Sequence, residues 1–334
     1  MRPQREPLNA NLEEHRPAFR GLSREQVFRL LMEYNTAIIF VAMLILAASL
    51  SDVFFTRNNI FNLLRQVSAL AGMGLGMLLV ILTGGIDLSV GSVAALASVM
   101  VAWFAPSVGL WPAIVLTVVI GTGCGAASGY LVAARKMAPF VATLAMMTIA
   151  RGFAFIVSKG SPIIVEDYRL SNFGAAYFLG IPSPVFVMIA IFALVAFLLR
   201  YTVFGRMITA IGSNEKAVRL AGIRAEWYKF AVYCISGAFC ALAGIISTSR
   251  TGVGSPIVQT GAELDAIAAV VIGGASLSGG KGTALQTLLG VLILGIIGNT
   301  MNLVNVPSYP QQVVKGVIII CAVLLQGWNR RPEA

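Results

Sequence analysis

The chain has 334 residues, of which 57% are hydrophobic and only 11% carry a charged side chain, and its mean hydropathy is +0.85. A soluble domain of ordinary composition has about 25% charged residues. Here apolar residues form nearly charge-free stretches, several of them longer than the roughly 18 residues that cross a bilayer. The composition excludes a soluble enzyme, a disordered chain and a secreted disulfide scaffold, and it predicts an all-α polytopic membrane protein.

The formal net charge of +10 comes from 24 Lys and Arg against 14 Asp and Glu. In a membrane protein such an excess is typical of basic cytoplasmic loops, so it does not indicate a nucleic-acid partner. All four cysteines lie in apolar stretches, which favours small buried side chains over disulfides or metal ligands.

Residues 1–34 are polar, contain six Arg and five Glu, and lack the apolar core of a signal peptide. We expect this tail to stay in the cytoplasm. Ser23 and Gln26 have capping-box spacing before an apolar stripe, which predicts a short interfacial helix leading into the membrane. The simpler interpretation is a lead-in helix without a partner.

Apolar segments predict about ten transmembrane helices between residues 35 and 327. They are 35–51, 66–83, 88–105, 110–133, 138–158, 184–200, 228–249, 264–275, 284–300 and 311–327. An even number of spans returns residues 328–334 to the cytoplasm as a second tail. The same parity places Arg135, Lys136 and the basic segment 200–229 inside, in agreement with the positive-inside rule.

Glycines are regularly spaced in two spans. Gly121, Gly125 and Gly129 form a double GxxxG ladder, and Gly72, Gly74 and Gly76 line another span. Such small residues permit close helix packing in lipid. A further pattern, GGxxLSxG, occurs at 84–91 and again at 273–280, each time between two apolar spans. Glycine-interrupted segments at matching positions favour an internal repeat near a transport pathway or its moving parts.

No catalytic constellation is visible. The only histidine, His15, lies in the polar tail, which excludes a histidine triad or a multi-histidine metal site. The segment Ser278–Thr283 resembles the end of a phosphate-binding P-loop, but the first glycine of that motif would fall on Ala275 and Gly282 follows the lysine. We therefore expect that the chain does not hydrolyse ATP itself.

Few ionisable residues lie at bilayer depth, where charges usually face a cavity, a partner or a pathway. Asp87 is either a pathway or gate residue or an N-cap for the span that begins near Val90. Glu263 and Asp265 start another span, where acidic groups favour the helix dipole. Arg151 and Lys315 either reach an interface or pair internally. Because there is no acidic relay through the spans, we expect the energy source to lie outside this chain.

The segment 205–227 predicts a short helix on the cytoplasmic side, with Ser213 as its cap and Gly222 at its end. Its small apolar face suits a lever that docks into a partner's groove. A helix lying on the membrane surface is the alternative.

Three motifs carry a resemblance to a known family. LTGGIDLSVGS at 82–92, AIGSNEKAVRLAGI at 210–223 and GAELDAIAAVVIGGASLSGGKGT at 261–283 resemble signatures of the permease subunits of sugar-importing ABC transporters. The likeness is greatest to bacterial ribose permeases, in the group that also serves xylose, arabinose, galactose and related sugars, and it spans about residues 34–327.

This resemblance implies a type II importer fold with about ten spans, in the bacterial inner membrane. It implies a second permease copy, a cytoplasmic ATPase that uses ATP and magnesium, and a periplasmic sugar-binding protein, with no cofactor or metal bound by this chain. The ATPase-coupling role is carried over to Gly212, Asn214, Glu215, Ala217, Arg219 and Gly222. The pathway or gate candidates, carried over more loosely, are Gly84, Gly85, Asp87, Ser89, Gly91, Glu263 and Asp265.

The resemblance thus implies a permease that moves a monosaccharide, ribose above others, by alternating access coupled to the separate ATPase. Three other functions compete with this one. One is an ABC permease for another small solute, such as another pentose or hexose, a signalling sugar, a nucleoside or a branched-chain amino acid. A second is an ion-coupled secondary carrier, whose transport would survive ATP depletion. A third is a membrane scaffold that transports nothing.

Overall fold

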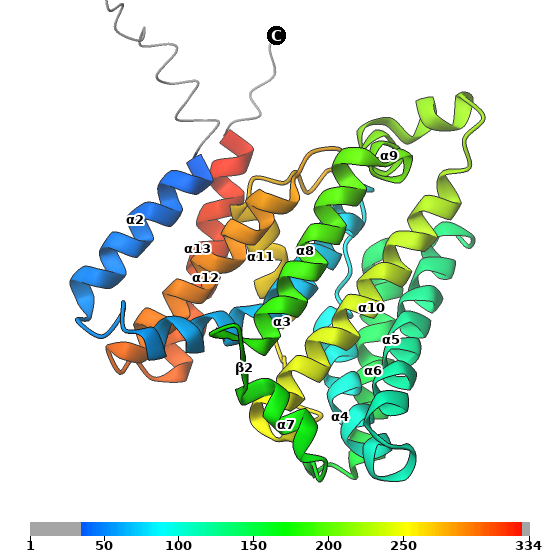
Figure 1. The fold of residues 1–334 in the computed structure, drawn as a ribbon. Helices are drawn as coiled ribbons and strands as arrows, with labels where there is room; N and C mark the ends of the chain where they lie inside the picture. Colours follow the sequence, from blue (N-terminus) through cyan, green and yellow to red (C-terminus); the bar gives the residue numbers. More distant parts are fainter. Residues whose placement is uncertain (1–34, 329–334) are drawn as a thin grey trace, which may run out of the picture. The chain divides into compact units, whose positions relative to one another are not determined.

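The structure is a computed structural model that describes residues 35–328 of the chain. Most of these residues are in helices (Figure 1). The predicted tail 1–34, with its interfacial helix, and residues 329–334 of the predicted C-terminal tail lie outside the described residues. The helices within residues 35–328 are α2 (Asn35–Leu50), α3 (Arg57–Leu82), α4 (Val90–Val108), α5 (Leu110–Ala133), α6 (Pro139–Ser158), α7 (Tyr168–Ala175), α8 (Ser183–Tyr201), α9 (Val203–Leu220), α10 (Ala225–Thr251), α11 (Ala262–Ile272), α12 (Ala284–Leu303) and α13 (Ser308–Trp328).

Four two-residue strands complete the described elements. β1 (Ile163–Ile164) pairs antiparallel with β4 (Val253–Gly254), and β2 (Tyr177–Phe178) pairs antiparallel with β3 (Ile181–Pro182). The first pair ties the loop after α6 to the loop after α10. The fold is therefore all-α, with short strands only in connections.

Each of the ten predicted spans coincides with a helix, namely α2, α3, α4, α5, α6, α8, α10, α11, α12 and α13. Seven helices within the described residues are long and apolar enough to cross a bilayer, and they are α3, α4, α5, α6, α8, α10 and α12. The predicted start at residue 66 is wrong, because α3 already begins at Arg57. Polar residues in its first turns, such as Asn58, Asn59 and Asn62, conceal this start from an apolar count.

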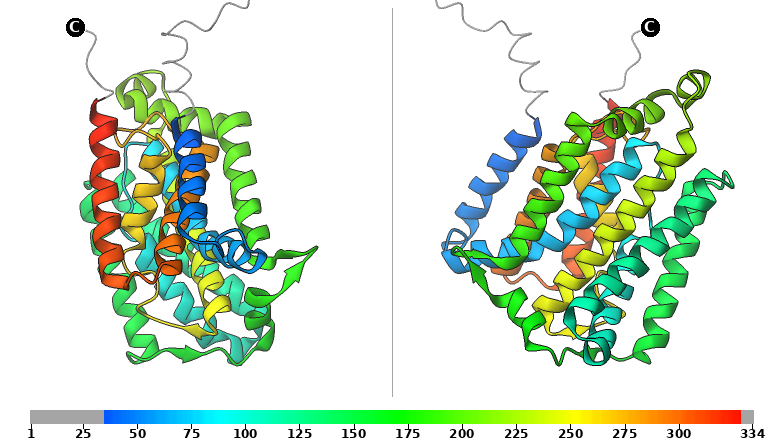
Figure 2. Two further views of the ribbon diagram at one scale, coloured as in Figure 1. Left: turned by 90° about the vertical axis from the view of Figure 1, so that its left-hand side faces the viewer. Right: turned by 45° about the vertical axis from the view of Figure 1, so that its right-hand side comes forward.

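The sequence did not predict α7, the short helix in the loop 159–182. Its cap is Asp167, whose carboxylate accepts a hydrogen bond from the backbone N–H of Arg169 at 2.9 Å. α7 lies against the end of α10, because a Cβ on Gly174 would overlap the backbone at Ser249. Figures 1 and 2 place α7 at one end of the bundle and α9 at the other.

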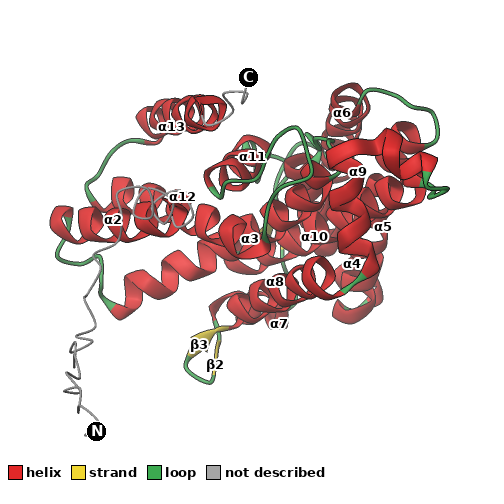
Figure 3. Ribbon diagram, turned by 90° about the horizontal axis from the view of Figure 1, so that it is seen from above, coloured by secondary structure: helices red, strands yellow, loops and turns green. Residues whose placement is uncertain are grey.

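α3 and α10 form the centre of the bundle, and most residues of their apolar stretches are buried. In Figure 3 they separate α2, α12 and α13 on one side from α4, α5 and α6 on the other. α5, α6 and α8 instead expose large apolar side chains such as Trp111, Ile156 and Phe197. On helices of this length such exposed faces suit contact with lipid tails.

The predicted glycine ladder lies in the contact between α5 and α10. A Cβ on Gly125 would overlap the Tyr233 carbonyl oxygen, and one on Gly121 would lie 2.7 Å from the Gly237 carbonyl oxygen. The third rung, Gly129, packs against Phe230 near the start of α10. The ladder therefore serves close helix packing, as its spacing predicts.

Candidate functional site

The segment expected to couple to a partner is the second half of α9. The helix is kinked at Asn214, whose backbone is non-helical (φ −158°, ψ 88°). The Asn214 side-chain oxygen accepts a hydrogen bond from the backbone N–H of Ala217 at 3.0 Å, which is the geometry of an N-cap. The predicted cap at Ser213 is wrong by one residue, because the Ser213 hydroxyl donates to the Thr209 carbonyl oxygen in the preceding turn.

The short helix after the kink ends as predicted at Gly222. This residue has φ +77°, and its N–H donates to the Arg219 carbonyl oxygen. The N–H of Ile223 donates to the Val218 carbonyl oxygen, which completes a Schellman motif. The segment 214–222 is thus a short helix closed at both ends by its own residues.

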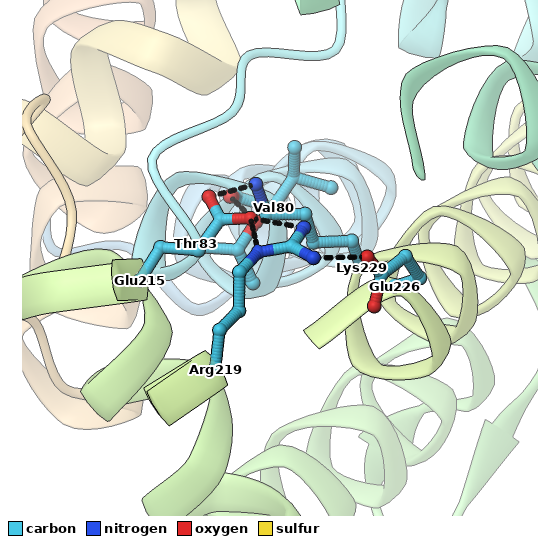
Figure 4. A network of polar contacts seen from close by, with 6 residues as sticks. All are labelled: Val80, Thr83, Glu215, Arg219, Glu226 and Lys229. Atoms are coloured by element: carbon cyan, nitrogen blue, oxygen red, sulfur yellow. Dashed lines mark hydrogen bonds and ion pairs between the residues drawn. The ribbon is translucent and has the colours of Figure 1, made fainter. Parts of the chain in front are cut away.

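A charge network fastens this short helix to the start of α10 (Figure 4). Arg219 pairs with Glu215 one turn earlier at 2.7 Å and with Glu226 of α10. Lys229 of α10 pairs with Glu215 at 2.5 Å. Burial raises the pKa of the Glu215 carboxyl, but the hydrogen bonds from Lys229 and Arg219 outweigh it and hold this pKa below its ordinary value of 4.5.

The two copies of the GGxxLSxG pattern both close a helix. At the end of α3, Gly84 has φ +79°, and the N–H groups of Gly84 and Gly85 donate to the Ile81 and Val80 carbonyl oxygens. The hydroxyl of Thr83 also donates to Val80 (Figure 4). This end is a Schellman motif as well.

At the end of α11 the same motif is formed by Gly274, with φ +85°, and Ala275. The structural partner of Gly84 is therefore Gly274, whereas the sequence pattern aligns Gly84 with Gly273. The predicted register of the repeat is wrong by one residue. The segments then diverge, because seven residues separate α3 from α4 whereas eleven separate α11 from α12.

Asp87 lies in the segment between α3 and α4 and is 2% exposed. One carboxylate oxygen accepts hydrogen bonds from the backbone N–H and the hydroxyl of Ser89, at 3.0 and 2.6 Å. The other accepts from the hydroxyl of Ser236 of α10 at 2.9 Å. The N-cap of α4 is Ser89 rather than Asp87, so the carboxylate organises the turn before the helix and ties it to α10.

The depth of this site follows from α10, which runs the length of the bundle. Ser236 is the twelfth of its 27 residues and so lies roughly 16 Å from its start at 1.5 Å per residue. Further along, Gly244 of α10 packs against Ala94 of α4, so the two helices run parallel. The first turn of α4 therefore lies level with the middle of α10, inside the bilayer.

The first turn of α11 lies at the same depth. The site of a Cβ on Gly91 is filled by a carboxylate oxygen of Glu263 and lies 2.6 Å from the Gln259 carbonyl oxygen. This Glu263 oxygen, Oε2, is buried and has no hydrogen-bond partner among residues 35–328. Two helix N-termini, each preceded by a non-helical segment, thus meet within the membrane. Interrupted helices of this kind form substrate sites in transporters.

Arg151 of α6 holds the non-helical segment that precedes α11. Its guanidinium donates to the carbonyl oxygens of Pro256 and Val258 at 2.6 and 3.1 Å. Arg151 therefore pairs internally, one of its two expected roles. Lys315 does so too, through an ion pair with Asp265 at 2.7 Å that joins α13 to α11.

The structure thus arranges the predicted site residues in three places. Asn214, Glu215, Ala217, Arg219 and Gly222 form the short helix after the kink. Gly84 lies near Gly212 at the end of α3, whereas Gly85 faces Val80 and Tyr233. Gly91 and Glu263 form the meeting point of α4 and α11, and Asp87 and Ser89 form the turn just before α4. Asp265 pairs separately with α13. Sequence reasoning missed Ser236 and Gln259. A serine in the middle of an apolar span was the available signal for the first.

Comparison with known proteins assigns a family. The family described as "Branched-chain amino acid transport system / permease component" matches residues 59–323. The chain belongs to this permease family. No solved structure matches it.

Curated relatives cover nearly the whole permease. It is 44% identical over 300 residues to the ribose import permease protein RbsC of Escherichia coli (strain K12), covering 88% of this chain and 94% of that protein. It is 47% identical over 289 residues to the ribose import permease protein RbsC of Bacillus subtilis (strain 168), covering 85% and 89%. The L-arabinose transport system permease protein AraH of Escherichia coli (strain K12) is 36% identical over 302 residues, covering 90% and 92%.

Proposed function

We propose that this permease is the membrane subunit of an ATP-driven importer that carries ribose across the bacterial inner membrane. The observation that carries the proposal is the 44–47% identity to ribose import permeases over at least 85% of the chain. Identity to the L-arabinose permease is lower, at 36%. The family's description names branched-chain amino acids, which makes them the control cargo.

The importer works by alternating access, with ATP hydrolysed by a separate ATPase and not by this chain. The short helix 214–222 docks on that ATPase and its movement changes which side the pathway faces. A periplasmic sugar-binding protein delivers the sugar on the opposite side, and a second copy of the permease completes the pathway within the lipid. The self-contained caps of the short helix and its charged, exposed residues support this docking role.

Both termini face the cytoplasm in this proposal. Basic residues support it, because they gather at the end of the bundle that carries α9, at Arg200, Arg206, Lys216, Arg219, Arg224 and Lys229. Positive charge near the ends of spans favours the cytoplasmic side.

We place the sugar pathway at the meeting point of α4 and α11. The unpartnered Glu263 oxygen is an acceptor that a sugar hydroxyl can satisfy. Asp87 supports the pathway wall, since its carboxylate already accepts three internal hydrogen bonds.

The test has two steps. The tagged permease is purified gently from its own membranes, co-purifying proteins are identified, and the complex is reconstituted in proteoliposomes with its binding protein. We expect an ATPase in the complex and ATP-dependent uptake of labelled ribose, with arabinose, galactose and leucine as alternative cargoes. Uptake that persists without ATP would instead indicate a secondary carrier, and uptake of leucine alone would overturn the sugar assignment.

A further inference from the structure

Three segments far apart in the sequence meet beside the kink of α9. They are the end of α3 at Leu82 and Gly84, the loop after α11 at Gly279 and Gly280, and Gly212 of α9. We call these five residues the glycine junction. The Gly280 N–H donates to the Leu82 carbonyl oxygen at 3.0 Å, so the first two segments are hydrogen-bonded to one another.

Backbone touches backbone throughout the glycine junction. A Cβ on Gly212 would overlap the Leu82 carbonyl oxygen and lie 2.5 Å from the Gly280 nitrogen. A Cβ on Gly279 would lie 2.9 Å from both the Gly212 Cα and the Gly84 nitrogen. Because glycine has no side chain, no change of rotamer can relieve a clash here. A displacement of α9 must therefore move the other two segments or break the contact.

Each of these segments leads to one side of the meeting point inside the membrane. From Gly84 the chain continues through Asp87 to the first turn of α4. Gly279 and Gly280 follow α11, whose first turn carries Glu263, and precede α12. Gly212, the third member, lies in α9 two residues before Asn214, which caps the short helix. The glycine junction thus lies between the short helix and both interrupted helices.

We propose that the glycine junction is the transmission point of the importer, and that Gly212 is a positioning residue that passes the movement of the short helix to α4 and α11 together. This inference rests on the proposed function, since it assumes that an ATPase moves the short helix. Gly212 binds no substrate. It acts by letting three backbones touch.

The decisive variant is Gly212→Ala, compared with Gly123→Ala on α5. Gly123 has open space around its Cβ position, so its substitution adds the same methyl group in a helix without a clash. Each variant is assembled with the ATPase and the binding protein, and both ribose uptake and ATP hydrolysis are measured. For Gly212→Ala we expect at least a tenfold fall in sugar transported per ATP hydrolysed, with hydrolysis within twofold of the wild type. Gly123→Ala should match the wild type in both.

An unchanged ratio in an assembled Gly212→Ala complex would overturn the proposal. A second measurement, on the wild-type complex, covers the case in which this variant does not fold. Hydrogen exchange is compared with and without a non-hydrolysable ATP analogue. We expect exchange in 83–89, 205–222 and 273–283 to change together, while the distant loop 161–180 stays constant. A change confined to 205–222 would also overturn the proposal.

The two proposals fail in different ways. If the wild-type complex takes up no sugar, the proposed function is wrong. If the wild-type complex transports ribose and Gly212→Ala transports it with the same coupling ratio, the function stands and the glycine junction has no part in transmission.

Discussion

Asp87 is a buried carboxylate at membrane depth, and its three hydrogen bonds explain how it is tolerated there. Both oxygens are occupied by donors from Ser89 and Ser236. A buried charge or polar group is costly unless it is paired in this way. Asp87 can therefore serve two roles: it stabilises the turn before α4, and its charge can act in the transport pathway.

The Asp87 variants separate these two roles. Asp87→Ala leaves the donors of Ser89 and Ser236 unpaired, and we expect it to destabilise the protein by about 1–3 kcal/mol. Asp87→Asn keeps one acceptor oxygen, and Ser236 can then accept from the new amide, so its thermal midpoint should stay close to that of the wild type. Thermal unfolding in detergent and ribose uptake are measured for both. An Asp87→Asn protein that is stable but does not transport would show that the charge itself serves the pathway.

Glu215 gives the short helix a pH dependence whose sign is fixed by its partners. Hydrogen bonds from Lys229 and Arg219 lower its folded-state pKa, so the network stabilises the folded protein at pH values above the ordinary carboxyl pKa. That stability is lost as the pH falls through the lowered pKa of the folded state. We expect the wild-type thermal midpoint to drop below about pH 4.5 more steeply than that of Glu215→Gln. Parallel curves for the two proteins would show that the network adds no stability.

At the scale of elements, the sequence predicts most of what the structure contains. Apolar runs bounded by glycine, proline and charge located ten helices, because hydrophobic length is the requirement for crossing a bilayer. Helix ends that depend on hydrogen bonds were harder to locate. Ser213 and Asn214 are both good caps, and the choice between them depends on where the backbone kinks.

The glycine pattern at 84–91 and 273–280 predicted breaks between spans, but it did not predict that α4 and α11 begin inside the membrane. The apolar segments 88–105 and 264–275 indicated two further spans, but the depth at which each begins depends on tertiary contacts. Those contacts are backbone approaches at Gly91 and side-chain bonds from Ser236 and Arg151. Only Ser236, a polar residue within an apolar span, and Gly91 of the GGxxLSxG pattern leave a local signal in the sequence.

The end of the short helix makes a prediction at this scale. Gly222 is in the left-handed region and has open space around its Cβ position, so a substitution there acts through the backbone alone. A non-glycine residue costs about 1–2 kcal/mol in this conformation, while Asn tolerates it. We expect Gly222→Val to loosen the short helix and to reduce ribose uptake several-fold with hydrolysis retained, and Gly222→Asn to restore most of the uptake. Equal loss in both variants would contradict a backbone effect.

On the scale of the whole molecule, the bundle has two chemically different ends. α10 starts at one of them, where Gly129 packs on Phe230 and the short helix is fastened by Glu226. It finishes at the other, where β4 pairs with β1 and α7 packs against Ser249. All loops at one end of the bundle must therefore face the same compartment. Locating a few of these loops thus tests both the positive-inside prediction and the topology of the whole bundle.

Cysteine labelling performs that test. In a protein whose four native cysteines are replaced by alanine, single cysteines are placed at Arg135 and Leu220, on the α9 end, and at Ser161, on the α7 end; all three positions are exposed. We expect a membrane-impermeant maleimide to label Ser161→Cys in spheroplasts, and Arg135→Cys and Leu220→Cys only after the membrane is permeabilised. Denatured samples control for reactivity. The reverse pattern would put the short helix outside the cell, beyond the reach of any cytoplasmic ATPase, and would exclude the coupling role. Mixed labelling of Arg135→Cys and Leu220→Cys would instead contradict the bundle itself, because both positions lie at the end where α10 begins.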